Sequence, residues 1–266
     1  MKLGIALLVA TLVMGGSALA QTKPARTALE GGPVESALWV GNSFFYYNNS
    51  MHGHVGQLIK AGDPQSHSRA VSVTIAGSGI DWHDMESYLR PGGGMGRYSF
   101  TAGNQIVFNK PGRQFDTVIV MDCSQCPIHP QLKGIFHEYV KKDREIIQKA
   151  GARPVLFMSW AYKDKPEMTA QLAEAYTAAG NEIDALVIPA GLAFARAIGK
   201  RPDLEFYQPD NRHPTLIGTY LAACTTYAAV YGKSPVGNPY LAGIDPATAK
   251  FLQAVAAETV QEYYGR

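Results

Sequence analysis

The chain has 266 residues, with 24 lysines and arginines against 22 aspartates and glutamates, so its formal net charge is only +2. Its basic residues form no run, and nucleic-acid binding needs a clustered basic patch, so we set aside a nucleic-acid partner. The length that remains after removal of an amino-terminal signal fits one domain of α/β type.

The amino terminus has the features of an export signal. Lys2 supplies the positive charge, residues 3–14 are mostly apolar, and Ala18-Leu19-Ala20 forms a small-residue cleavage site. The apolar stretch is shorter than the roughly 18 residues of a membrane span, so a retained anchor is the less favoured alternative. We therefore predict a signal peptide over residues 1–20, a periplasmic or secreted protein, and no stable membrane span after signal removal.

Residues 21–36 are polar and interrupted by proline and glycine, and we expect them to form a flexible leader. A single domain over residues 37–266 follows. Its apolar, β-rich runs are short and recur at regular intervals, as buried strands do. Strands are expected at Ala37–Val40, Val71–Ile75, Thr117–Met121, Pro154–Met158 and Ala185–Ile188.

Segments with helical spacing lie between and after these strands. Helices are expected at Asn48–Lys60, Ile135–Ala150, Met168–Ala179, Thr215–Tyr231 and Pro246–Tyr264. Alternating strands and helices imply parallel pairing through right-handed crossovers. The predicted fold is a three-layer α/β/α sandwich with a flavodoxin-like, five-stranded parallel sheet, whose ligand site lies at the carboxyl ends of the strands.

The longest irregular part of the domain is expected at Arg90–Lys110, which contains Pro91-Gly92-Gly93-Gly94. Long glycine-rich insertions in compact domains are often active-site lids. We expect this segment to lie near the active edge as a lid or a substrate wall.

Ser43 directly follows the first predicted strand, in Gly41-Asn42-Ser43. Its position makes it a candidate nucleophile, and a hydroxyl needs a neighbouring base to attack well. Asp210 and His213, three residues apart, supply a base and a carboxylate that would orient it. Either motif alone is weak evidence, because a serine after a strand often caps a helix, and aspartate and histidine are both common in loops. Together they contain the three parts of a serine hydrolase.

An oxyanion hole is the third requirement of such a site. Gly77, after the second predicted strand, is the first candidate for a backbone donor, together with the N–H of Ser43. Gln125 or Ser124, after the third predicted strand, would add a side-chain donor. Gly79, Trp82 and His83 follow Gly77 and are candidate cleft residues.

These blocks resemble the SGNH (GDSL-like) hydrolases, in the branch whose first block reads Gly-Asn-Ser. The resemblance covers nearly all of the mature chain in order and spacing, and it rests on four blocks. They are Val40-Gly41-Asn42-Ser43-Phe44, Ala76-Gly77-Ser78, Asp122-Cys123-Ser124-Gln125 and Asp210-Asn211-Arg212-His213. The third block departs from the family's usual Gly-x-Asn-Asp, so the asparagine donor has no counterpart, and Ser124 or Gln125 stands in its place.

The resemblance implies a serine, histidine and aspartate site that hydrolyses esters without a metal or cofactor. Ser43 would be the nucleophile, His213 the base, Asp210 its partner and Gly77 an oxyanion donor. From the export signal and the exposed aromatic residues we expect a small-molecule or polysaccharide ester as substrate, for example an acetylated carbohydrate. A lipid ester or thioester is the alternative within the same family.

Three other classes compete with this interpretation. Cys123 and Cys126 form a Cys-x-x-Cys motif after a strand, which is typical of thiol-disulfide redox proteins but equally of a structural disulfide. The odd cysteine, Cys224, is expected to be a buried small hydrophobe. A non-catalytic carbohydrate-binding protein could share the fold. A metal site is disfavoured, because His52 and His54 do not share a helix face and are interpreted as surface or loop residues.

Overall fold

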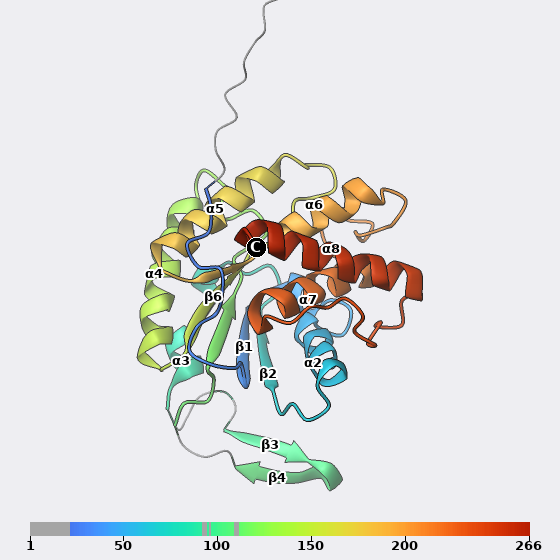
Figure 1. Cartoon of the computed structure of the whole chain (residues 1–266). Helices are drawn as coiled ribbons and strands as arrows, with labels where there is room; N and C mark the ends of the chain where they lie inside the picture. Colours follow the sequence, from blue (N-terminus) through green and yellow to red (C-terminus); the bar gives the residue numbers. More distant parts are fainter. Residues whose placement is uncertain (1–21, 92–94, 96, 109–111) are drawn as a thin grey trace, which may run out of the picture.

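The computed structural model describes residues 22–91, 95, 97–108 and 112–266 (Figure 1). The predicted signal peptide at residues 1–20 lies outside the described residues. Five strands form one parallel sheet in the order β2-β1-β5-β6-β7. Their bounds are β1 Ser36–Gly41, β2 Arg69–Thr74, β5 Thr117–Val120, β6 Arg153–Phe157 and β7 Leu186–Ile188. This is the predicted sheet, with each strand shifted by no more than two residues at either end.

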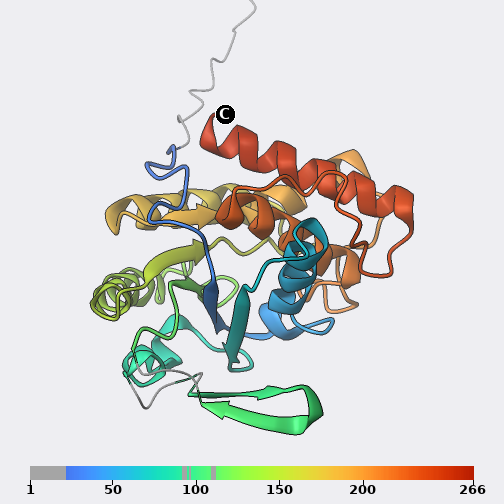
Figure 2. The ribbon, with the colours of Figure 1, turned by 60° about the horizontal axis from the view of Figure 1, so that its bottom comes forward.

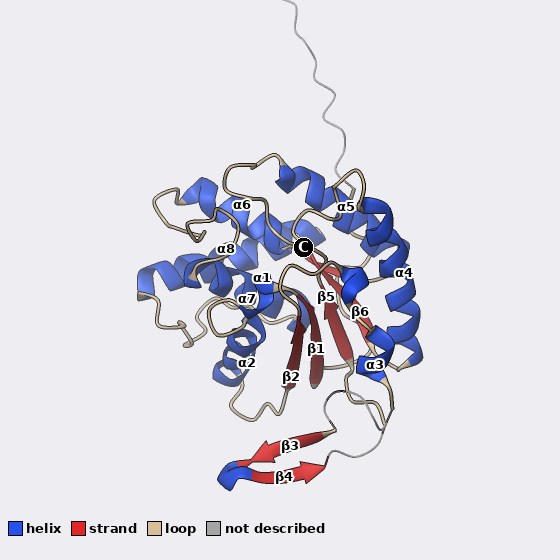
Figure 3. Ribbon diagram, turned by 180° about the vertical axis from the view of Figure 1, so that it is seen from behind, coloured by secondary structure: helices blue, strands red, loops and turns tan. Residues whose placement is uncertain are grey.

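Helices cover both faces of the sheet, as the crossover rule predicts (Figures 1 and 3). One face carries α3 (Met85–Leu89), α4 (Lys133–Lys149) and α5 (Met168–Glu182). The other carries α2 (Met51–Gly62) and α7 (Leu216–Tyr231), and α8 (Pro246–Tyr264) packs on α7. Helix α6 (Ala190–Lys200), which the sequence patterns did not indicate, joins α5 to α7 and α8.

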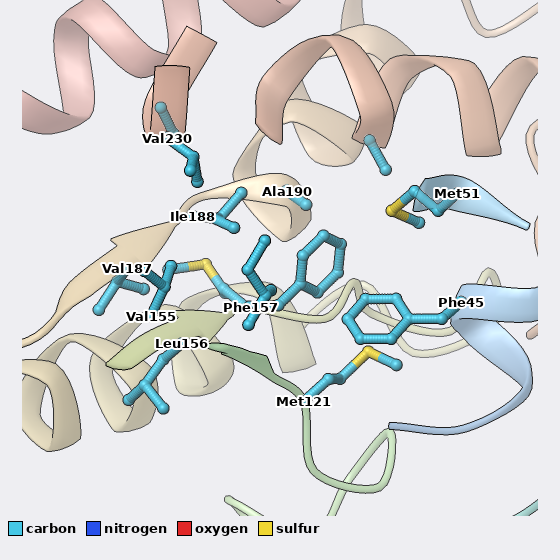
Figure 4. Packing of buried hydrophobic residues seen from close by; sticks show 14 of the residues in the cluster. Phe45, Met51, Met121, Val155, Leu156, Phe157, Val187, Ile188, Ala190 and Val230 are labelled. Carbon is cyan, nitrogen blue, oxygen red and sulfur yellow. The ribbon is translucent and has the colours of Figure 1, made fainter. Parts of the chain in front are cut away.

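Helix α7 is the most deeply buried helix of the described chain. Ala222, Ala223 and Cys224 have no exposed surface, because α2, α6 and α8 pack around α7. The expectation of a buried Cys224 is confirmed. Phe45 and Phe157 meet edge to face at 5.0 Å beneath the ends of β1 and β6, so the core continues to the edge of the sheet that leads to Ser43 (Figure 4). Among the described residues, no helix combines the length and the apolar character that a membrane span needs.

Residues 22–35, which we expected to be a flexible leader, instead lie against the body of the protein with specific partners. Arg26 pairs with Asp184, and the backbone N–H of Ala25 donates to Asn181 at 2.7 Å. The guanidinium of Arg153 donates to the carbonyl oxygens of Glu30 and Gly32 at 2.8 and 2.7 Å. The expectation was wrong because distant side chains satisfy this polar backbone, which local composition does not reveal.

The Arg90–Lys110 segment is also different from the expectation. Its described part forms a hairpin of β3 (Tyr98–Thr101) and β4 (Gln105–Phe108), joined by the short turn η2 (Ala102–Asn104). The hairpin lies at the end of the sheet where the strands begin, opposite the end that leads to Ser43 (Figures 1 and 3). The described part is therefore a regular hairpin, and it does not lie over the edge of the sheet that leads to Ser43.

Gly191 at the start of α6 offers a test of this packing. A Cβ there would collide with the backbone carbonyl of Ser159, two residues after β6. We expect Gly191→Ala to lower the free energy of unfolding by about 1–3 kcal/mol, the usual effect of overpacking a tight contact. Gly199→Ala in the same helix is the matched control, because a Cβ there meets open space. It should be neutral or stabilise by about 0.5–1 kcal/mol in urea unfolding. Equal effects of the two would contradict the packing.

Candidate active site

Ser43 is placed by the residue before it. Asn42 caps the short helix α1 (Ser43–Tyr46) by accepting from the N–H of Phe44 at 3.2 Å. Its Nδ2 donates to the carbonyl oxygens of Ser78 and Asp122 at 3.0 and 3.1 Å. One buried amide thus ties together the segments after β1, β2 and β5. An aspartate at this position would have no N–H₂ group to donate to these two carbonyl oxygens.

The three residues predicted as a catalytic triad are in contact. Nε2 of His213 lies 2.8 Å from Oγ of Ser43, and Nδ1 of His213 is hydrogen-bonded to Oδ2 of Asp210. A carboxylate only accepts, so Nδ1 carries the proton and Nε2 of the neutral imidazole is left to accept from the serine hydroxyl. Ser43 is buried, with only 8% of its surface exposed. This order of contacts is the one that activates a serine.

The loop that carries Asp210 and His213 is held by backbone contacts. Oδ1 of Asp210 accepts from the N–H groups of Arg212 and His213, both at 2.9 Å. Nε1 of Trp160, after β6, donates to the carbonyl of Arg212 at 3.0 Å. Thr215 caps α7 immediately afterwards, so His213 lies in the turn before that helix.

These contacts also act on the carboxyl group of Asp210. Partial desolvation opposes its ionisation, but hydrogen bonds from the His213 ring and from the backbone N–H groups of Arg212 and His213 outweigh it. Together they lower the pKa of Asp210 to about 2. The group is therefore a carboxylate throughout the neutral and mildly acidic range, as an orienting partner must be.

Aromatic rings enclose the imidazole. Tyr47 stacks on His213 with ring centroids 4.3 Å apart, and Phe44 meets the same ring edge-on at 5.5 Å. Phe44 in turn stacks on the fully buried Trp160 at 4.6 Å. The candidate base is thus packed between Phe44 and Tyr47, which follow Ser43 in the chain, and this packing limits the rotation of its ring.

The loop after β2 that contains Gly77 and Gly79, called the glycine loop below, supplies free backbone donors. Gly77 has a positive φ of 71°, which favours glycine, and its N–H makes no hydrogen bond with any other described residue. Ser43 begins α1, so its N–H likewise has no partner within the helix. Gly79 sits close to Asp122, whose Oδ1 would lie 3.3 Å from an added Cβ. These positions are compatible with the predicted oxyanion role of Ser43 and Gly77, which stays a prediction.

The two candidate side-chain donors differ in their surroundings. The Ser124 hydroxyl is hydrogen-bonded to the Tyr162 hydroxyl at 2.6 Å. The half-buried Gln125 makes no side-chain hydrogen bond with another residue in the described part of the chain. Gln125 is therefore the freer of the two amide or hydroxyl donors after β5.

His83 holds the glycine loop in place. It is buried, and its Nε2 lies 3.1 Å from Oγ of Ser78, which donates to the carbonyl of Gly41 at 3.3 Å. Burial lowers the pKa of His83, so the ring is neutral at physiological pH. Trp82 beside it is 59% exposed and has no ring partner among the described residues, so its indole is available at the rim.

Asp122 is a buried acidic residue of the site that the sequence motifs do not single out. It lies two residues after β5 and is 2% exposed. Oδ1 accepts from the N–H groups of Ile80 and Cys123 at 2.8 and 2.7 Å, which joins the glycine loop to the third strand end. Oδ2 has no partner among the described residues, and burial raises the pKa of Asp122 to about 6. The available signal was an acidic residue immediately after an apolar strand.

Cys123 and Cys126 are joined by a disulfide, and Cys126 is buried. With Asp122 they are the only group of three metal-ligating side chains in the described parts of the chain. Their sulfur atoms are engaged with each other, so this group offers no thiolate to a cation. The histidine interpretation needs one correction. His54 is buried in α2, where its ring bonds to the Asn48 carbonyl at 2.7 Å and the Tyr240 hydroxyl at 2.8 Å.

Comparison with known proteins points to one fold. No family model matches the chain, and no curated protein matches it. Among solved structures, it is similar to a DUF4886 family protein from Bacteroides uniformis, with 22% identity, a TM-score of 0.58, and coverage of 86% of this chain and 95% of that one. A putative SGNH hydrolase from Slackia heliotrinireducens follows, with 18% identity, a TM-score of 0.52, and coverage of 73% and 97%. This chain has the fold of the SGNH hydrolases.

A third similar structure is a catalytic mutant of an acetylxylan esterase from Geobacillus stearothermophilus. It shares 12% identity with this chain, with a TM-score of 0.55 and coverage of 76% of this chain and 96% of that one. At such identities the similarity establishes the fold and leaves the activity to the site itself.

Asp122 gives a testable consequence of the loop geometry. Its pKa in the fold exceeds the unfolded value, so the folded state binds a proton more readily, and stability falls as pH rises from about 4 to about 6. The shift of about two units corresponds to roughly 3 kcal/mol at most. Asp122→Asn keeps an acceptor for Ile80 and Cys123 and removes the buried charge. We expect it to be more stable than the wild type at pH 8, with the difference shrinking by pH 4.

The matched variant is Asp122→Ala, which leaves two buried N–H groups without an acceptor, a loss of about 1–3 kcal/mol each. It should unfold at lower urea concentration than Asp122→Asn at both pH values. Equal stability of the alanine and asparagine variants would show that the two hydrogen bonds do not hold the loop.

Proposed function

We propose that this protein is an exported serine esterase that hydrolyses carboxylic esters through an acyl-enzyme. The observation that supports this most strongly is the continuous hydrogen-bond chain from Asp210 through His213 to Ser43. The residues that form it lie on two segments that the sheet brings together, and each atom in the chain has the donor or acceptor role that acyl transfer requires.

The reaction follows from this geometry. Oγ of Ser43 attacks the ester carbonyl carbon while Nε2 of His213 takes the hydroxyl proton. The resulting oxyanion accepts hydrogen bonds from the N–H groups of Ser43 and Gly77, with Gln125 as a side-chain donor. His213 then gives its proton to the leaving alcohol, and the acyl group remains on Ser43. A water molecule, deprotonated by His213, attacks the acyl carbon; the bond to Oγ of Ser43 then breaks, His213 returns its proton to Oγ, and the acid is released. Asp210 orients the imidazole through its hydrogen bond and stays ionised throughout.

The structural comparisons support this reading. Three mutants of the Geobacillus acetylxylan esterase are described as catalytic, and they change an aspartate, a histidine three residues further on and a serine. The same residue types occur here with the same aspartate-to-histidine spacing. For substrate we favour short acyl esters of carbohydrate, because Trp82 and Tyr46 are exposed aromatic surfaces on which a sugar can stack.

Removal of the nucleophile tests the class of reaction. We expect wild-type protein to hydrolyse short-chain aryl esters, and Ser43→Ala to reduce kcat by roughly 10⁴-fold or more. Ser87→Ala, in α3 and outside the hydrogen-bond chain, is the matched control and should keep full activity. Full activity of Ser43→Ala would exclude the mechanism, as would a wild type with no hydrolysis across the panel.

The pH dependence tests the base. Imidazole takes a proton only when neutral, so the rate should fall as the pH drops from 7 to 4. Asp210 does not cause this fall, because its pKa is about 2. Asp122 has a pKa of about 6 and titrates in the same range, so the profile should be repeated with Asp122→Asn. The acid limb should persist in that variant, whereas a rate that stays flat to pH 4 would argue against a histidine base.

A further inference from the structure

The β3–β4 hairpin has one face made entirely of large apolar side chains. The strands are antiparallel, with Tyr98 opposite Phe108 and Phe100 opposite Ile106. Side chains alternate along a strand, so these four residues share one face, while Ser99, Thr101, Gln105 and Val107 share the other. All four are largely exposed: Tyr98 by 53%, Phe108 by 71%, Phe100 by 63% and Ile106 by 55%. We refer to these four residues as the apolar face.

Nothing in the described chain covers this face. Every residue of both strands is exposed, and neither strand pairs with the five-stranded sheet. Figure 2 shows the hairpin below the body of the protein, away from the helices. A two-stranded hairpin is marginally stable alone in water, and contiguous apolar patches on a protein surface usually mark an interaction site. The exposed hairpin is therefore expected to bind an apolar partner.

The stretch of sequence that contains the hairpin carries charges of one sign. No aspartate or glutamate occurs between Glu86 and Asp116, whereas this stretch contains Arg90, Arg97, Lys110 and Arg113. Arg90 and Arg97 are exposed and form no ion pair with a described residue. Arg97 immediately precedes β3, so the apolar face has a free positive charge beside it in a stretch of chain without acidic residues. This combination complements an apolar surface edged with negative charge. Anionic lipid headgroups above acyl chains have this arrangement.

Other occupants fit less well. A carbohydrate needs hydrogen-bond partners and a flat ring to stack on, but the apolar face carries only the Tyr98 hydroxyl. Its rings also meet edge-on, with Tyr98 at 90° to Phe100 and 70° to Phe108. A second copy of the chain, docked face to face, would bring two exposed Arg97 side chains toward each other without an acidic partner in this stretch, and like charges repel.

We propose that the β3–β4 hairpin docks the protein on an anionic lipid surface. The apolar face enters the boundary between headgroups and acyl chains, and Arg97 lies among the headgroups. The catalytic edge is at the opposite end of the sheet (Figures 1 and 3), so the docked protein presents Ser43 to the solvent. If the proposed esterase function holds, its substrate is then a soluble or polymeric ester rather than a lipid of the same bilayer; the docking itself does not depend on that function.

Vesicle co-sedimentation of the mature chain tests the docking. Vesicles of phosphatidylcholine with 30% phosphatidylglycerol, about one lipid in three so that the surface is clearly anionic, are compared with vesicles of phosphatidylcholine alone. We expect binding to the anionic vesicles that weakens in high salt, because salt screens exposed charges. The double variant Phe100→Ser with Phe108→Ser should bind at least about tenfold less, and Arg97→Glu should also bind less.

Val107→Ser is the matched control, since Val107 is 49% exposed on the opposite face of the same hairpin. It should bind like the wild type, and thermal unfolding midpoints of all variants should agree, which separates docking from folding. Equal binding to neutral and anionic vesicles, or equal loss in Val107→Ser, would overturn the proposal. The absence of vesicle binding would also overturn it. In that case, a dimer that is lost in the double variant would indicate a second copy as the occupant, and sedimentation with an insoluble polysaccharide would indicate a carbohydrate.

Discussion

The candidate site depends on one hydrogen bond, between His213 and Ser43, which joins segments 170 residues apart at 2.8 Å. The parallel sheet makes this contact available, because β1 delivers Ser43 to the carboxyl edge and the loop before α7 returns to the same edge. The contact is then held from both sides. Asn42 anchors the nucleophile segment to the neighbouring strand ends, and Trp160 and Tyr47 anchor the histidine.

Much of this arrangement could be predicted from the sequence, because its signals are local. The five strands are short apolar runs, and Asp210 and His213 lie in a turn whose following helix is capped by Thr215. The remainder depends on distant partners. The burial of His54 requires Tyr240, and the fixed leader requires Asp184 and Arg153. The exposed hairpin has alternation over only four residues per strand, too short to distinguish from a glycine-bordered loop.

A buried polar network is the less expected part of the site. Asp122 links the N–H groups of Ile80 and Cys123, and His83 links Ser78 to the same loop. Burial of Asp122 opposes folding at neutral pH, yet its hydrogen bonds keep the glycine loop beside the nucleophile segment. Such a balance is usual where function requires buried polar groups in fixed positions. The segment after β5 thus contributes the Asp122 carboxylate, which organises the glycine loop, while the Gln125 amide stays free.

The central claim is that Ser43 is the nucleophile. The most direct test is to label the purified protein with a fluorophosphonate, which reacts with activated serines, and to locate the adduct by peptide mapping. The account predicts one phosphonylated residue, Ser43, and a strong loss of labelling in His213→Ala, because the base that activates the hydroxyl is gone. An adduct on any other serine, or no adduct under conditions that label a known serine hydrolase, would contradict it.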